Sequence, residues 1–292
     1  MGDWSPGDID VVSRAILSAP SVHGAQPWNL RLDGTCAEIR ERTEFANESG
    51  LVDAPRADRV ISCGTSIANV ELALHALGRK IETDLLPDPR QPDLLATIRT
   101  VGSTSASSTD LRLFSALARR RSHREAFADI PVPAATIGDI VAAARIDGVA
   151  TTLLAPDEAP ALADVLLYSA DRIRRDPCHK RDIFPWASDQ LTFDRESIGA
   201  CQQVMTREVS DSVGLAEAIE SETVLIFSSN TPEPIDLLRT GIAVERAWLT
   251  AVDARLSASI FSHPLRIEDS AQRLAQRLNL SSHPQLILRT GY

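Results

Sequence analysis

The sequence has few cysteines, few aromatic residues and no long apolar run. Its four cysteines, Cys36, Cys63, Cys178 and Cys201, are scattered without a CxxC pair, which argues against a metal knuckle and against a disulfide framework. No segment approaches the roughly 18 continuous apolar residues of a membrane helix. The first residues also lack a basic stretch followed by an apolar one. These absences predict a cytoplasmic chain with reduced thiols and no membrane partner.

Positive charge is scarce as well. The 30 Lys and Arg residues stand against 40 Asp and Glu residues, which gives a formal net charge of -10. A general nucleic-acid binder needs a basic surface, so the composition predicts no nucleic-acid partner. Hydrophobic residues make up 43% of the chain, an ordinary globular fraction, and 292 residues can form two domains or one large one.

Common catalytic motifs are missing too. The sequence contains no GxGxxG, GxxxxGK[ST], HExxH or GxSxG pattern. Its six histidines have no metal-ligand spacing, so we expect no bound metal. Cys63 has no His or carboxylate at a recognised motif spacing, and we interpret it as a structural residue at a helix start rather than a nucleophile.

Periodic apolar residues and capping signals predict alternating helices and strands. A Ser-Pro pair followed by Asp8 is typical of a helix start. Further helices are predicted for residues 61–77, 111–117, 137–144, 159–173, 237–256 and 267–278. Strands are predicted for residues 28–32, 37–39, 81–86, 149–154, 223–227 and 285–288. Residues 41–59 are interpreted as a surface loop and residues 90–108 as a connector between two halves.

Two polar segments are candidates for binding. The first, residues 19–28 (APSVHGAQPW), combines turn formers with hydroxyl, amide and bare backbone groups, although its composition is also that of an ordinary connection. The second, residues 119–124 (RRRSHR), lies at the end of a predicted helix. Guanidinium groups supply the fixed donors that a phosphate dianion needs. Arginines at a helix end also complement the helix dipole, which is an alternative explanation for them.

Both segments resemble motifs of one family. Residues 19–28 are similar to the APSxHNxQPW signature of flavin-dependent nitroreductases, and Arg120–Arg124 with the later Phe127 and Pro131–Pro133 resemble that family's RRSxR...F...PV opening. Residues 61–66, 85–89, 241–249 and 283–292 further resemble its Acg-like, actinobacterial branch. In that branch two nitroreductase halves are fused in one chain.

The resemblance implies an α+β, nitroreductase-like fold with mixed or antiparallel sheets flanked by helices. It implies a first half at residues 1–100, a second half at residues 101–292, and lid-like material at residues 175–212. The two halves would form an intramolecular pseudo-dimer. Because each half-site motif occurs once, we expect one cofactor site per chain and a monomer with an internal pseudo-two-fold axis.

The implied cofactor is FMN. The first segment would lie against the isoalloxazine ring and ribityl chain, the second would hold the phosphate and pyrimidine edge, and a backbone NH after the long helix would approach flavin N5. The residues so implied are Pro20, Ser21, Val22, Gly24, Gln26, Arg120, Arg121, Ser122, Arg124, Ile260, Ser262, His263 and Arg289. Gly24 departs from the family pattern, which has an Asn whose amide meets the flavin. No side chain is assigned a catalytic role, since the cofactor carries the chemistry.

The implied activity is an oxidoreductase reaction. Hydride from NADH or NADPH would reduce the flavin, and a small planar acceptor, nitroaromatic or quinone, would take up the electrons. Two alternatives stay open from the sequence: a protein that binds and sequesters FMN without turnover, and a scaffold that binds no flavin.

Overall fold

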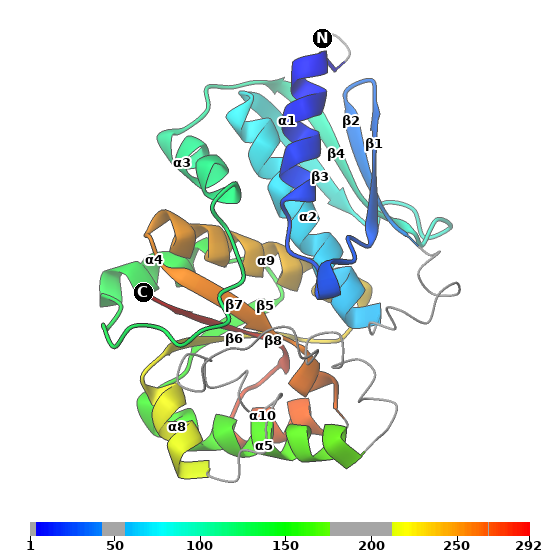
Figure 1. Cartoon of the computed structure of the whole chain (residues 1–292). Helices are drawn as coiled ribbons and strands as arrows, with labels where there is room; N and C mark the ends of the chain where they lie inside the picture. The colour runs from blue at the N-terminus through cyan, green and yellow to red at the C-terminus, as the bar shows by residue number, and fades with distance from the viewer. Residues whose placement is uncertain (1–3, 43–55, 176–211, 268) are drawn as a thin grey trace, which may run out of the picture. The chain divides into compact units, whose positions relative to one another are not determined.

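Two four-stranded antiparallel sheets with helices packed on them form the structure, a computed structural model that describes residues 4–42, 56–175, 212–267 and 269–292 (Figure 1). This arrangement confirms the predicted α+β class with antiparallel sheets. The expected lid-like segment and most of the expected surface loop at residues 41–59 lie outside the described residues. Two compact units are present: one comprises residues 1–120, 142–147 and 233–253, and the other the rest.

The first unit contains the sheet with strand order β1-β2-β4-β3. Its strands are β1 (Trp28–Asp33), β2 (Cys36–Glu41), β3 (Arg79–Leu85) and β4 (Leu94–Ser103), and every neighbouring pair is antiparallel. The hairpin between β1 and β2 turns at Gly34, whose φ is 55°. This confirms the turn expected from the Asp-Gly pair.

The helices described in this unit include α1 (Pro6–Leu17), α2 (Arg56–Ala76), α3 (Ser108–Leu117) and α9 (Pro234–Asp253). The predicted helix start is confirmed, and there Ser5 and Asp8 form a capping box, in which each side chain accepts a hydrogen bond from the other residue's backbone N–H. Residues 60–70 of α2 are buried without a break. The reason is that α1, α3, α9 and the sheet all pack around this helix.

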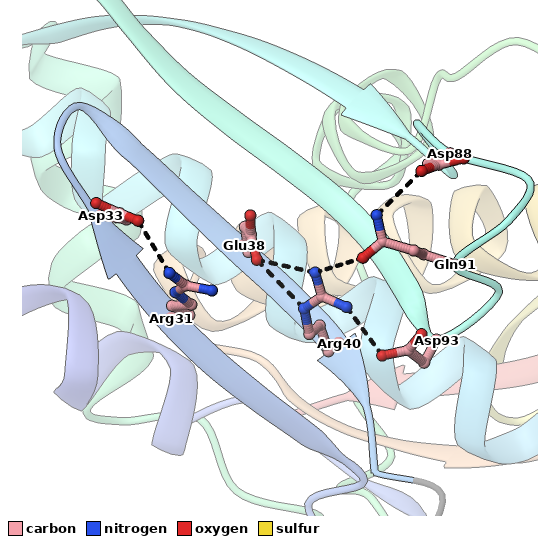
Figure 2. Close-up of polar contacts among 7 residues, drawn as sticks. All are labelled: Arg31, Asp33, Glu38, Arg40, Asp88, Gln91 and Asp93. Carbon is pink, nitrogen blue, oxygen red and sulfur yellow. Dashed lines mark hydrogen bonds and ion pairs between the residues drawn. The ribbon is translucent and has the colours of Figure 1, made fainter.

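Arg40 of β2 forms ion pairs and a hydrogen bond that connect this strand with the turn that precedes β4 (Figure 2). The Arg40 guanidinium donates to Glu38 at 3.1 Å, to Asp93 at 3.0 Å and to Gln91 at 3.0 Å. The hydrogen bond with Asp93, above all, raises the pKa of Arg40. Two carboxylates already compensate this arginine, so it is a poor candidate for holding an anionic ligand.

Helices α2 and α9 approach each other at two glycines. A Cβ built on Gly64 would lie 2.9 Å from the Gly241 Cα and would overlap the Leu238 carbonyl oxygen. A Cβ on Gly241 would lie 2.8 Å from the Gly64 Cα and would overlap the Ile61 carbonyl oxygen. Each glycine therefore faces the carbonyl three residues before the other. This reciprocity relates the two helices by an approximate two-fold axis, as in an isologous interface.

The second unit contains the sheet with strand order β5-β6-β8-β7. Its strands are β5 (Val149–Leu153), β6 (Thr223–Ser229), β7 (Ser257–Phe261) and β8 (His283–Gly291), again antiparallel throughout. Helices α5 (Ala159–Arg175), α8 (Ser212–Glu220) and α10 (Ser270–Arg277) pack with β6 and β8 around one apolar core. Helix α4 (Ala134–Ala143) precedes β5.

The same topology thus occurs twice. In each sheet the strands stand in the order first, second, fourth and third along the chain, and a long helix, α2 or α9, connects the second strand to the third. Such a repeat is what two fused halves imply. The compact units do not follow the two halves of the sequence, because α9 from the second half packs on α2. The boundary at residue 100 stays a prediction.

Several predicted elements are wrong or incomplete. The expected connector at residues 90–108 contains β4, which lies between β2 and β3. Its Ser and Thr residues suggested a loop, but threonine is β-branched and suits a half-buried strand. Strand β7 was also missed, and α2 begins at Arg56 instead of Ile61. Helix α3 ends at Leu117, so the following arginines are not in its last turn.

The two glycines predict a sharp stability difference. Gly64→Ala or Gly241→Ala should lower the free energy of unfolding by about 2 to 3 kcal/mol, because a methyl group would overlap backbone atoms that no rotamer change can move. The matched control is Gly138→Ala in α4, where a Cβ meets nothing within 4 Å. Urea unfolding should show the control as stable as the parent chain or more stable. Equal stability of Gly64→Ala and Gly138→Ala would contradict this packing.

Candidate functional site

The loop between α1 and β1, residues 18–27, has a backbone that few sequences can adopt. A single 3-10 turn, Val22–Gly24, forms its tip. His23, Gly24 and Gln26 all have positive φ, at 51°, 69° and 48°. Glycine adopts this region without strain, whereas other residues do so at some cost. Gly24 therefore adopts its positive φ without strain, and a Cβ there would meet nothing within 4 Å.

Side chains of α2 hold this loop in place. Ser62 Oγ accepts a hydrogen bond from the Val22 N–H at 3.0 Å, and Thr65 Oγ1 donates to the Pro20 carbonyl at 2.7 Å. The Cys63 thiol donates to the Pro27 carbonyl at 3.3 Å. Burial raises the pKa of this thiol well above its ordinary value. Cys63 is thus a protonated, buried anchor, as the structural interpretation expects, but it lies inside α2 and not at a helix start.

The polar side chains of the loop are used within the loop. Ser21 Oγ accepts from the Gln26 N–H at 3.0 Å, and the Gln26 amide donates to the Leu17 carbonyl at 3.2 Å. Ser21, Val22 and Gln26 are partly exposed, and Pro20 is buried. His23 and Gly24 are exposed. What the tip offers to a ligand is therefore mainly backbone.

Arg120, in the basic segment, contacts buried side chains of α9 through its guanidinium group. Its guanidinium carbon lies 4.6 Å from the ring centre of Trp248, and its Nε lies 4.0 Å from Glu245 Oε1. One Nη donates to the Ser18 carbonyl at 3.2 Å. Glu245 and Trp248 come from α9 and are completely buried. The guanidinium thus joins α9 to the start of the loop.

Glu245 is an ionisable group inside the protein core. Burial raises the pKa of this carboxyl from 4.5 to about 7, against the opposing effects of the Arg120 charge and the Asn69 amide. Sequence reasoning missed Glu245, Trp248 and Asn69. The available signal was a lone glutamate among apolar residues in the stretch GIAVERAWL.

Arg121, Ser122 and Arg124 belong to the second unit, where their segment contacts β7 through Ser122 and His123. Ser122 forms a parallel bridge with Ala258, and the His123 N–H donates to the Ala258 carbonyl at 2.9 Å. Arg121 and Ser122 are exposed, and Arg124 is half-buried, which lowers the pKa of its guanidinium. The segment is thereby held to β7 by one isolated bridge.

The residues that follow Ser122 pack in a stack of two rings and a guanidinium group. The His123 and Phe127 rings stack with centres 4.9 Å apart, and the Arg289 guanidinium lies 4.3 Å from the Phe127 ring centre. Arg289 also pairs with Glu222 at 2.9 Å and donates to the Glu125 carbonyl. Its side chain is 0% exposed. The cofactor contact expected of Arg289 stays a prediction.

The remaining predicted site residues lie at the end of β7. Ile260 pairs with Leu288 of β8, Ser262 follows the strand, and His263 begins the 3-10 turn His263–Arg266. All three site residues are partly exposed. The second unit thus contains Arg121, Ser122 and Arg124, of which Ser122 pairs with β7, and it contains Ile260, Ser262 and His263 at or just after the end of that strand. The loop residues and Arg120 lie in the first unit.

Two other classes of site were sought in the described part of the chain. Within it, no group of three or more His, Cys, Asp or Glu side chains is placed to hold a metal ion. None of its helices is both long and apolar enough to cross a membrane.

The model of the nitroreductase family matches residues 117–292, more than half of the chain. The chain belongs to the nitroreductase family. The match begins just before the basic segment and includes α9 and all four strands of the second sheet. The family membership expected from the two sequence motifs is confirmed.

Individual proteins are also similar to this chain. Putative NAD(P)H nitroreductase Rv3131 of Mycobacterium tuberculosis is 26% identical over 97% of this chain and 85% of its own. Putative NAD(P)H nitroreductase acg of the same organism is 22% identical over 97% and 89%, which confirms the resemblance to the Acg-like branch. The FMN-dependent nitroreductase NfnB from Mycobacterium smegmatis, solved in complex with NADPH, is 14% identical, with a TM-score of 0.44, over 63% of this chain and 89% of its own.

The buried carboxyl predicts a pH-dependent stability. Its pKa is about 7 in the folded chain and 4.5 as the ordinary value. Between these two values the folded state binds more protons than the unfolded state, so the contribution of Glu245 to the free energy of unfolding falls as the pH rises. Glu245→Gln removes this titration. The stability of the variant relative to the parent should therefore increase from pH 4.5 to pH 7, by on the order of 3 kcal/mol.

Urea unfolding of both chains across this pH range measures the effect. Asp10→Asn is a suitable control, because Asp10 is an exposed residue of α1. A stability difference between Glu245→Gln and the parent that does not change with pH would contradict the buried setting of this carboxyl.

Proposed function

We propose that this chain binds one FMN and acts as an NAD(P)H-dependent oxidoreductase that reduces a small planar acceptor, a nitroaromatic or a quinone. The observation that carries the proposal is the match to the nitroreductase family, in a chain that keeps both family-like segments. The names of the related proteins, which refer to NAD(P)H and nitroreductase activity, support the nicotinamide partner.

The residues present suit FMN. The backbone at His23 and Gly24, two exposed residues with positive φ, can approach a planar ring closely because no Cβ projects at Gly24. Arg121, Ser122 and Arg124 are donors of the kind that a phosphate requires. We assign the first set to the isoalloxazine and ribityl groups and the second to the phosphate.

The chain's own residues bind and orient in this proposal. The hydrogen bonds from Ser62 and Thr65 fix the loop before any ligand arrives, which lowers the entropy lost on binding. We assign Ile260, Ser262 and His263 to the edge of the ring that carries N5. When bound, FMN supplies hydride acceptance and donation, and the protein contributes position and electrostatics.

A second candidate is a protein that stores FMN without turnover. Gly24 favours it, because the family's asparagine amide is absent at this position and the loop offers only backbone there. Stopped-flow mixing of the flavin-loaded chain with NADPH separates the two functions. Rapid bleaching of the flavin absorption supports the oxidoreductase, and a persistent yellow colour supports storage. A purified chain that ignores added FMN would exclude both.

Flavin stoichiometry is the first prediction of this proposal. Because each motif occurs once in the chain, fluorescence titration with FMN should saturate at about one equivalent per chain. The parent chain in denaturant serves as the control for nonspecific quenching. Saturation at two equivalents of similar affinity would exclude a single site.

A restored amide at residue 24 is the second prediction. Gly24→Asn should tighten FMN binding by about 0.5 to 1.5 kcal/mol, the value of one neutral hydrogen bond. Asn tolerates the left-handed backbone, so the variant should fold. Gly34→Asn is a matched control: Gly34 also has positive φ and open space around a Cβ, but lies in the β1–β2 hairpin. If both variants bind FMN like the parent chain, the loop does not touch the flavin.

A further inference from the structure

Arg120 is chemically equivalent to Arg121 and Arg124 in the sequence but not in the structure. Its side chain is 12% exposed, whereas Arg121 is exposed and Arg124 is half-buried. Its contacts with Glu245, Trp248 and the Ser18 carbonyl lie within the first unit. The Glu245 carboxyl is buried, and the Arg120 charge lowers its pKa against the effect of burial.

These contacts hold the guanidinium in one orientation. The Arg120 guanidinium stacks its flat face on the Trp248 ring, turns one edge toward Glu245 and donates from one Nη to a carbonyl. This stacking and fork geometry distinguishes arginine from lysine. A positive charge that already compensates a buried carboxylate is a poor phosphate ligand, since turning it outward would leave that carboxylate unpaired.

The carbonyl that Arg120 binds belongs to Ser18, the first residue of the loop at residues 18–27. We call this loop, which we assign to the flavin ring, the flavin loop. Ser18 is the C-cap residue of α1, and the last carbonyls of a helix lack partners within the helix. The Leu17 carbonyl accepts from Gln26 at the loop's far end, and the Ser18 carbonyl accepts from Arg120. Both ends of the loop are therefore fixed at the end of α1.

We propose that Arg120 is a positioning residue for the flavin loop and not a phosphate ligand: held by Glu245 and Trp248, it fixes Ser18 and thereby the path of residues 19–26. This inference rests on the proposed function, and it differs from the phosphate contact that the sequence resemblance implies for Arg120. Arg120 would fix the conformation of the loop in the flavin-free chain. Its effect on affinity should therefore be the same for flavins with and without a phosphate.

Riboflavin separates the two roles, because it has the ring but no phosphate. Arg120→Met should weaken FMN and riboflavin by the same factor, about tenfold, which corresponds to roughly 1.4 kcal/mol. Arg124→Met is the comparison, and it should weaken FMN about tenfold or more while changing riboflavin about twofold or less. Arg120→Met that weakens FMN but leaves riboflavin unchanged would overturn the positioning role.

A double variant guards against misfolding of the single one. Arg120→Met leaves the Glu245 carboxylate without its counter-charge, whereas Arg120→Met with Glu245→Gln removes both charges together. The double variant should unfold at a urea concentration close to that of the parent and still bind both flavins about tenfold more weakly. Parent-like affinity of the folded double variant for both flavins would overturn the inference.

Hydrogen exchange of the flavin-free chain gives a readout independent of ligand. The Val22 N–H donates to Ser62 of α2, and the Gln26 N–H donates to Ser21 of the loop. In the double variant both amides should exchange faster, while the exchange of amides in the β1–β2 hairpin should not change. Unchanged exchange at both loop amides would count against the inference. A parent chain that binds neither flavin overturns the proposed function and this inference with it. Selective loss of FMN in Arg120→Met overturns this inference alone.

Discussion

The close approach of α2 and α9 at Gly64 and Gly241 is the constraint on which the candidate site depends. The turn of α2 around Gly64 carries Ser62, Cys63 and Thr65, which anchor the loop at residues 18–27. One turn beyond Gly241, α9 carries Glu245, which compensates Arg120. Backbone contact between the helices thus fixes two groups of loop anchors at once. Because packed interfaces tolerate little added volume, a change in this spacing should be felt at the loop.

Buried polar side chains of α2 form hydrogen bonds with the backbone of the loop. Hydroxyl and thiol side chains in the middle of α2 are unusual for a helix core, and their partners are carbonyls and N–H groups of the loop. A loop with positive φ at His23, Gly24 and Gln26 needs such support, since those conformations are unfavourable for His23 and Gln26 on their own. The sequence around Gly64 is therefore explained by the loop that it holds.

Local chemistry made part of this structure predictable. The capping box at Ser5 and the Asp-Gly hairpin depend on adjacent residues, and the family motifs indicated the loop and the basic segment. Strand β4 was missed because its partners, β2 and β3, come from distant parts of the chain and its polar residues resemble a connector. The difference between Arg120 and Arg121 could not be predicted either. It arises from Glu245, more than 100 residues away in the sequence, so only the folded chain reveals it.

The most direct test of this account is a crystal structure of the chain grown with FMN. The account predicts one FMN per chain, with the isoalloxazine ring against the backbone of Val22–Gly24, the phosphate within hydrogen-bond distance of Arg121 or Arg124, and Arg120 still stacked on Trp248. An isoalloxazine ring bound away from the loop at residues 19–28 would contradict it.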